Sequence, residues 1–182
     1  MTGRWPPTTS DVNRYSPSSL KFPPFMDDID NQFYEDLIRE DDLGLVLRGQ
    51  LHIEHQLIEL CSLFMPCADR CDWGSISYKA KVELAYGVGL SEELKDLFLK
   101  IGALRNGFAH NLDAAVDAKA ILNLYNGLPT VIAGAIKECY RQQYKSELTA
   151  PSRMPARDLL VLILLCARQS AKAAIHLARE RD

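Results

Sequence analysis

LSEELKDLFLKIGALRNGFAH, residues 90–110, is the stretch of this 182-residue chain that decides its fold. Ser91 is placed to cap a helix, and Glu92 and Glu93 fall in the first turn, where the helix dipole favours acids. Apolar residues then recur at three- and four-residue steps, which predicts one stripe of an α-helix. This stripe consists of Leu94, Leu97, Phe98, Ile101, Leu104 and Phe108. We expect the helix to end near Gly107, because Asn and Gly suit helix termini.

Two charged residues fall inside apolar stripes. Arg105 lies in the middle of the stripe of residues 94–108, and Glu54 points with Gln50 into the apolar face of an earlier helix. A guanidinium cannot lose its proton, so a buried arginine needs an acid or a phosphate beside it. Because burying either charge alone is costly, we expect Glu54 and Arg105 to pair. The pattern leaves open whether such a pair serves chemistry or only fixes the register of two helices.

The rest of the chain follows helical periodicity, and no segment shows the alternation of a half-buried strand. Ser75 or Ser77, Asp113 and Pro155 are placed to begin helices, and residues 126–129 form a turn. The sequence therefore predicts an all-α fold, an antiparallel up-and-down helical bundle. The expected helices cover residues 27–40, 41–65, 75–87, 91–107, 113–125, 130–144 and 155–179.

The first 25 residues differ from the rest in composition. They hold five of the nine prolines of the chain, together with several serines and threonines. A segment of this composition cannot continue a helix or bury much surface. We therefore expect a flexible, disordered N-terminal arm over residues 1–25 and a single helical domain over residues 26–182. A chain of this length is long enough to bury a sizeable core.

The composition and net charge indicate a globular protein that is not a basic nucleic-acid binder. The hydrophobic fraction of 47% is that of an ordinary globular protein, and the net charge of −3 argues against a basic nucleic-acid binder. The charge is uneven, since residues 27–60 hold ten acids against two arginines. We expect these acidic first helices to offer a partner surface and an anionic partner to meet the C-terminal part.

Cysteine usage and hydropathy bear on location. The chain has five cysteines, an odd number, and its first residues are polar and proline-rich instead of forming the apolar segment of a signal peptide. We therefore expect free thiols in a cytoplasmic protein. The longest apolar run, residues 159–167, is less than half of the ~20 residues that a membrane helix needs, so no membrane association is expected.

Metal and cofactor sites are not indicated. Cys61, Cys67 and Cys71, with His52 and His55, include only one C-x3-C pair, whereas structural zinc sites use two close pairs. We expect the first of these cysteines in the core and the other two in a loop. The sequence predicts no metal and no other cofactor.

A line of cations lies on the last predicted helix. Arg168, Lys172, His176 and Arg179 are spaced four, four and three residues apart, so they share one face. This face can meet RNA, an acidic partner, the acidic first helices of the chain itself, or only solvent. No segment resembles a helix-turn-helix with a basic recognition helix, so we expect no sequence-specific DNA binding.

The end of the quoted stretch carries a family motif. Arg105-Asn106-Gly107-Phe108-Ala109-His110 matches the R-N-x-x-x-H form of the Rx4-6H signature of the HEPN superfamily of small helical domains. Together with the block KVELAYGVGL at residues 81–90, it resembles the mannitol operon repressor (MltR-like) branch of that superfamily. The resemblance covers residues 42–126 and implies a HEPN-like helical domain that forms a homodimer.

The motif can also be interpreted chemically. Metal-free RNA cleavage needs an acid or base near neutral pH and a fixed cation for the charge that grows on phosphorus. His110 suits the first task and Arg105 the second, with Asn106 and Glu54 in support, as the resemblance to HEPN ribonucleases also implies. The alternative is that Asn106 and His110 only cap the helix end and fix the following turn.

Two functions follow as hypotheses. The first is a regulatory or interaction protein resembling mannitol operon repressors, which acts through protein partners and has no DNA-reading motif of its own. The second is a metal-independent HEPN endoribonuclease, a toxin or defence effector, with RNA as its partner and Arg105, Asn106 and His110 as its site. A third interpretation gives Arg105 and His110 a role in folding alone.

Overall fold

The computed structural model describes residues 28–109, 115–144 and 150–180, and the predicted arm of residues 1–25 lies outside this part of the chain. These described residues form helices and contain no strand, which confirms the all-α class. The α-helices are α2 (Asp28–Arg39), α3 (Asp42–Leu63), α4 (Tyr78–Gly87), α5 (Glu92–Ala109), α6 (Ala118–Asn126), α7 (Thr130–Tyr144) and α8 (Ala156–Arg179). Two short 3-10 turns, η3 (Ala68–Arg70) and η4 (Pro151–Arg153), lie in the connections.

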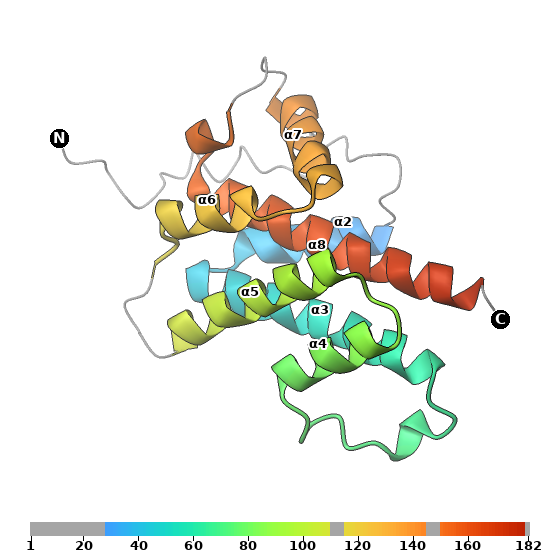
Figure 1. Ribbon diagram of the computed structural model, residues 1–182. Helices are drawn as coiled ribbons and strands as arrows, with labels where there is room; N and C mark the ends of the chain where they lie inside the picture. The colour runs from blue at the N-terminus through green and yellow to red at the C-terminus, as the bar shows by residue number, and fades with distance from the viewer. Residues whose placement is uncertain (1–27, 110–114, 145–149, 181–182) are drawn as a thin grey trace.

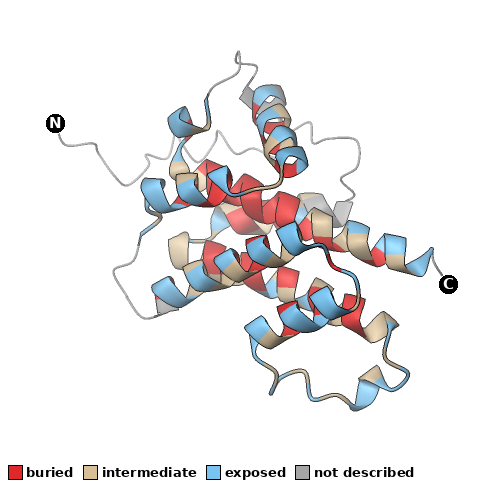
Figure 2. Ribbon diagram, in the orientation of Figure 1, coloured by how far each residue is buried: buried red, intermediate tan, exposed pale blue. Residues whose placement is uncertain are grey.

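The last helix is the centre of the core. α8 packs against α2, α3, α5, α6 and α7 (Figure 1), and its residues 158–168 are buried without interruption. Figure 2 shows this buried stretch in the middle of the molecule, with exposed residues towards the end of α8. The predicted antiparallel, up-and-down order of the helices stays a prediction.

α8 also bears on the question of a membrane. It is the one described helix long and apolar enough to cross a bilayer, and 67% of its most apolar stretch is buried inside the protein. A stretch of helix that is apolar all round, as residues 159–167 are, is typical of the centre of a core. The run of residues 159–167 therefore has its apolar contacts within the fold.

Local side-chain chemistry explains where several helices begin. Asp41 accepts from the Gly44 amide at 2.6 Å at the start of α3, and Ser77 accepts from the Ala80 amide at 3.2 Å at the start of α4. Each bond satisfies an amide that has no partner inside its helix. Of the two predicted caps, Ser75 and Ser77, the structure uses the second.

One predicted helix boundary was wrong, and another lies within two residues of the observed one. α5 is helical to Ala109, two residues beyond Gly107, and Phe108 in this last turn is buried at 5% exposure. α6 begins at Ala118 and is capped by Asp117, which accepts from the Ala120 amide at 3.0 Å, and not at residue 113. Asp113 itself lies outside the described residues.

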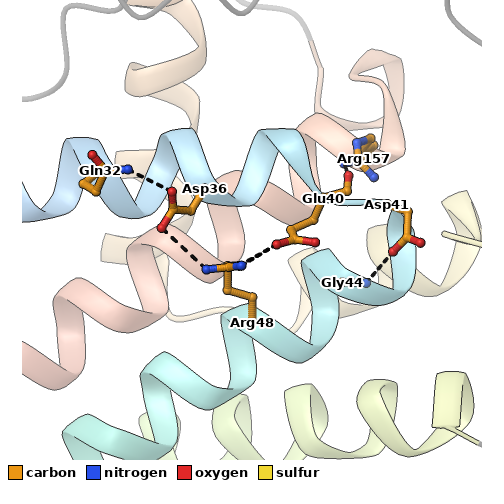
Figure 3. A network of polar contacts seen from close by, with 7 residues as sticks. All are labelled: Gln32, Asp36, Glu40, Asp41, Gly44, Arg48 and Arg157. Atoms are coloured by element: carbon orange, nitrogen blue, oxygen red, sulfur yellow. Dashed lines mark hydrogen bonds and ion pairs between the residues drawn. The ribbon is translucent and has the colours of Figure 1, made fainter.

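The acidic segment at the start of the domain is neutralised from within the chain. Arg48 of α3 lies 3.5 Å from the Asp36 carboxylate and 2.6 Å from that of Glu40 (Figure 3). Arg157, in the first turn of α8, donates to the Glu40 carbonyl oxygen and lies 2.5 Å from the Asp42 carboxylate. These arginines tie α2, α3 and α8 together, so part of the predicted acidic partner surface is already occupied.

Candidate functional site

Arg105 and Asn106 lie in the last two turns of α5. The Arg105 guanidinium is half-buried and donates from Nη1 to the Asn106 side-chain oxygen at 3.3 Å. Its Nε is buried and has no hydrogen-bond partner among the described residues. The cation is therefore held by its neighbour in the motif and keeps hydrogen-bonding capacity for an oxygen ligand.

The predicted pairing of Glu54 with Arg105 was wrong. Among the described residues, the Glu54 carboxylate lies 2.5 Å from the Lys81 ammonium and accepts from the Gln50 amide at 3.0 Å, so both of its oxygens are engaged. Lys81 is 4% exposed and comes from α4. A buried ammonium needs an acid as strongly as a buried guanidinium does, and α4 packs directly on α3.

Glu54 and Arg105 nevertheless share a pocket. It has a volume of about 650 Å³ and lies between α3, the start of α4 and the last two turns of α5. Its lining includes Gln50, Glu54, Tyr78, Arg105 and Asn106. The structure thus brings together three of the four predicted site residues, while His110, the fourth, lies outside the described residues.

Tyr78 is a member of this pocket that sequence reasoning missed. Its hydroxyl donates to the Phe98 carbonyl oxygen at 3.1 Å, and burial, with the nearby Glu54 charge, raises the pKa of its phenol far above the ordinary value. The phenol therefore stays protonated and acts as a donor. The one residue in the sequence that could have pointed to Tyr78 is Gly102 of α5. An added Cβ there would lie 2.7 Å from the Tyr78 ring, so only glycine leaves room for this ring.

This arrangement is suited to binding an anion beside a neutralised acid. The Lys81 ammonium compensates the charge of Glu54, so the guanidinium of Arg105 is available to an oxygen ligand in the pocket. A fixed guanidinium with an amide beside it can bind a phosphate or carboxylate group. Acid–base chemistry would require His110 as well.

The structure also shows where the cysteines and the cations of the last helix lie. Cys61 is buried in the core and Cys67 is exposed, as expected, and the described residues contain no group of three or more His, Cys, Asp or Glu that could hold a metal ion. On the cationic face of α8, Arg168 stacks over the Phe33 ring at 4.9 Å and Arg179 lies 2.8 Å from Glu59. Two of the four residues of this face therefore contact α2 and α3, in line with one of the four alternatives considered.

Comparisons with known proteins add no relative to this picture. The chain was compared with protein-family models, with curated proteins and with solved structures, and nothing in any of the three matches it.

Proposed function

We propose that the protein is a regulatory or interaction module resembling mannitol operon repressors, which acts through protein partners. The observation that carries this proposal is where large apolar side chains are exposed. Six such side chains are more than a third exposed among the described residues, and four of the six belong to α3, to the residue that ends it and to α4. The four are Leu51, Phe64, Leu84 and Tyr86.

The position of Leu51 gives the argument its weight. It lies in the middle of α3, between the buried residues Gln50 and Ile53, and yet is 61% exposed. Burying a fully exposed leucine side chain completely is worth about 1.5–3 kcal/mol, and at 61% exposure the isolated chain leaves more than half of this unused at Leu51. A partner that packs on α3 and α4 would gain this free energy. α3 and α4 pack against each other, and exposed apolar side chains on neighbouring elements are typical of protein interaction sites.

The acidic surface predicted from the sequence is less suited to a partner than the apolar one, because its carboxylates are already paired. Asp36 and Glu40 are paired with Arg48, and Asp42 is paired with Arg157. Charged groups that are already paired gain little from a new partner. We therefore define the partner surface as the exposed apolar residues Leu51, Phe64, Leu84 and Tyr86, and a second copy of the chain is one partner that can cover it.

The experiment is photo-crosslinking in the cell from a single unnatural residue placed at position 51 or at position 84. Positions 119 and 137, exposed on α6 and α7, are the matched controls. We expect one defined adduct, identified by mass spectrometry, from positions 51 and 84 and none from the controls. Equal adduct patterns from all four positions would contradict the proposed partner surface.

A second function, the metal-independent endoribonuclease, is favoured by one specific observation. Arg105 and Asn106 are hydrogen-bonded to each other in the same pocket as Glu54, and the Arg105 Nε has no partner among the described residues. In this hypothesis Arg105 binds the phosphate and stabilises its transition-state charge, while His110 acts as acid and base.

Its test is RNA cleavage by the purified protein in EDTA. Cleavage that leaves 2′,3′-cyclic phosphate ends and disappears in Arg105→Ala and His110→Ala would support the nuclease. Gly107→Ala is the matched control within the motif, because an added Cβ there meets nothing within 4 Å. Cleavage that persists in Arg105→Ala and His110→Ala would contradict the assignment, as would no cleavage by the wild type.

A further inference from the structure

A second and larger concavity lies away from the Arg105 pocket. It is a groove of about 980 Å³ between α3, α7 and α8, and it shares no lining residue with the pocket described above. Figure 1 shows α7 standing against α8 on the side of the molecule away from α4. Its volume lies near the upper end of the ~300–1,000 Å³ typical of small-molecule sites.

The α7 side of the groove is aliphatic. Val131, Ile132 and Ala135 line it, and no Phe, Tyr or Trp is among the lining residues. Val131 is 84% exposed, the highest value among the large apolar side chains of the described residues. An aliphatic chain lying along α7 would cover this valine.

The opposite side of the groove carries positive charge. Arg168 and Lys172 line it, in a chain whose net charge is −3. Arg179 lines it as well but is paired at 2.8 Å with Glu59, the only acid among the lining residues. Arg168 is 4% exposed and is held against the Phe33 ring at 4.9 Å. A cation that is fixed before binding loses little freedom when an anion arrives.

Further hydrogen-bond donors line this cationic side. The Gln169 side-chain nitrogen is buried and has no hydrogen-bond partner among the described residues, which is costly unless a ligand oxygen accepts from it. Three of the four histidines of the chain, His52, His55 and His176, also line the groove. These side chains provide several donors for the oxygens of one carboxylate or phosphate group.

We propose that this groove binds a single-chain amphiphile with an anionic head. The oxygens of the head lie at Arg168, Lys172 and Gln169, and the aliphatic chain lies along Val131 and Ile132. The groove is large enough for such a ligand. Its aliphatic wall matches the chain of the ligand, and its positively charged wall matches the head. This inference goes beyond the proposed function and does not depend on it.

The test is isothermal titration calorimetry of the full chain with decanoate and with decyl phosphate, both below their micellar ranges, to distinguish a carboxylate from a phosphate head. We expect one of the two to bind at one site per chain. Lys172→Glu and Val131→Asp should each weaken binding at least about tenfold, since each removes one half of the complementarity. Lys137→Glu, exposed on α7 and outside the groove, should leave binding unchanged.

Component probes and a fold check complete the experiment. Decanol lacks the charge and acetate lacks the chain, so either one binding as tightly as decanoate would overturn the proposal. No binding of decanoate or decyl phosphate at millimolar concentration would also overturn it. If Val131→Asp instead converts a dimer into monomers, the groove is a subunit interface and the proposal fails. Thermal melts of each variant check that it is folded. If Lys172→Glu is not folded, Lys172→Gln takes its place.

Discussion

The Lys81 ammonium lies 2.5 Å from the Glu54 carboxylate, although the two residues are 27 positions apart. The Lys81 side chain is 5% exposed and that of Glu54 is 19% exposed, so this ion pair lies largely inside the protein. It joins α4 to α3 beside the pocket that holds Arg105. Because Glu54 is thereby compensated, the positive charge of Arg105 remains available to that pocket.

Removing the lysine of this pair should be strongly destabilising. Lys81→Met leaves the Glu54 carboxylate partly buried without its cation, and we expect a loss of about 3 kcal/mol in the free energy of unfolding, measured in urea. The double variant Lys81→Met with Glu54→Leu removes both charges and should recover most of the loss. If the double variant were as unstable as the sum of the two single variants, Lys81 and Glu54 would not be energetically coupled.

Two glycines on different helices should respond oppositely to alanine. At Gly49 of α3, an added Cβ would lie 2.6 Å from the Leu164 side chain of α8, so Gly49→Ala should cost about 1–3 kcal/mol through overpacking. At Gly134 of α7 the added Cβ meets nothing within 4 Å, and Gly134→Ala should gain up to about 1 kcal/mol of helix stability. Urea unfolding of both variants checks the close approach of α3 to α8. A stabilising Gly49→Ala would contradict it.

His52 should make stability depend on pH. Burial lowers its pKa below 6.5, and the nearby charges of Arg168, Arg48 and His55 act in the same direction, while Asp36 opposes them. The unfolded chain therefore takes up this proton at a higher pH than the folded chain. The stabilisation is complete above about pH 6.5 and is lost as the pH falls from there towards the lowered pKa.

The measurement is the thermal midpoint between about pH 8 and pH 5. His52→Gln should flatten the decline on the acidic side, even if it lowers stability at every pH by removing the ring that contacts Phe33 at 4.5 Å. Gln56→Ala, on the same helix, removes no titrating group and is the control that should keep the wild-type slope. A wild-type slope in His52→Gln would show that this imidazole is not the group responsible.

Arg157 should be needed to hold the start of α8 against the start of α3. It donates to the Glu40 carbonyl oxygen and to the Asp42 carboxylate, and its side chain is 21% exposed. Arg157→Ala should cost about 1.5–3 kcal/mol by urea unfolding, the range for hydrogen bonds to charged groups. Arg157→Lys should recover only part of this, since an ammonium cannot reproduce the forked geometry. Arg153→Ala, exposed on the preceding turn, should be nearly neutral.

Much of the fold could be predicted from local patterns. The helix of residues 130–144 was expected and found over the same residues, because the turn at residues 126–129 precedes it and apolar residues recur along one side. Ser77 likewise marks the start of α4 by a bond within one turn. Signals of this kind depend on neighbours in the sequence, so they can be recognised without knowing the tertiary structure.

The partner of Glu54 could not be predicted in the same way. The apolar stripes indicated that Glu54 and Arg105 both face inwards, but which cation meets the acid depends on the rotation and spacing of three helices. Lysines are rarely fully buried, so nothing in the local pattern marked Lys81 as the partner.

The proposed function is tested most directly by transcript profiles of a deletion strain that is complemented with variants at matched abundance. If the protein regulates through a partner on α3 and α4, the wild type and Arg105→Ala with His110→Ala restore the transcript levels, whereas Leu51→Glu with Leu84→Glu does not. The reverse pattern, in which the Leu51 and Leu84 variant restores the levels and the Arg105 and His110 variant fails, would contradict this account and favour the nuclease.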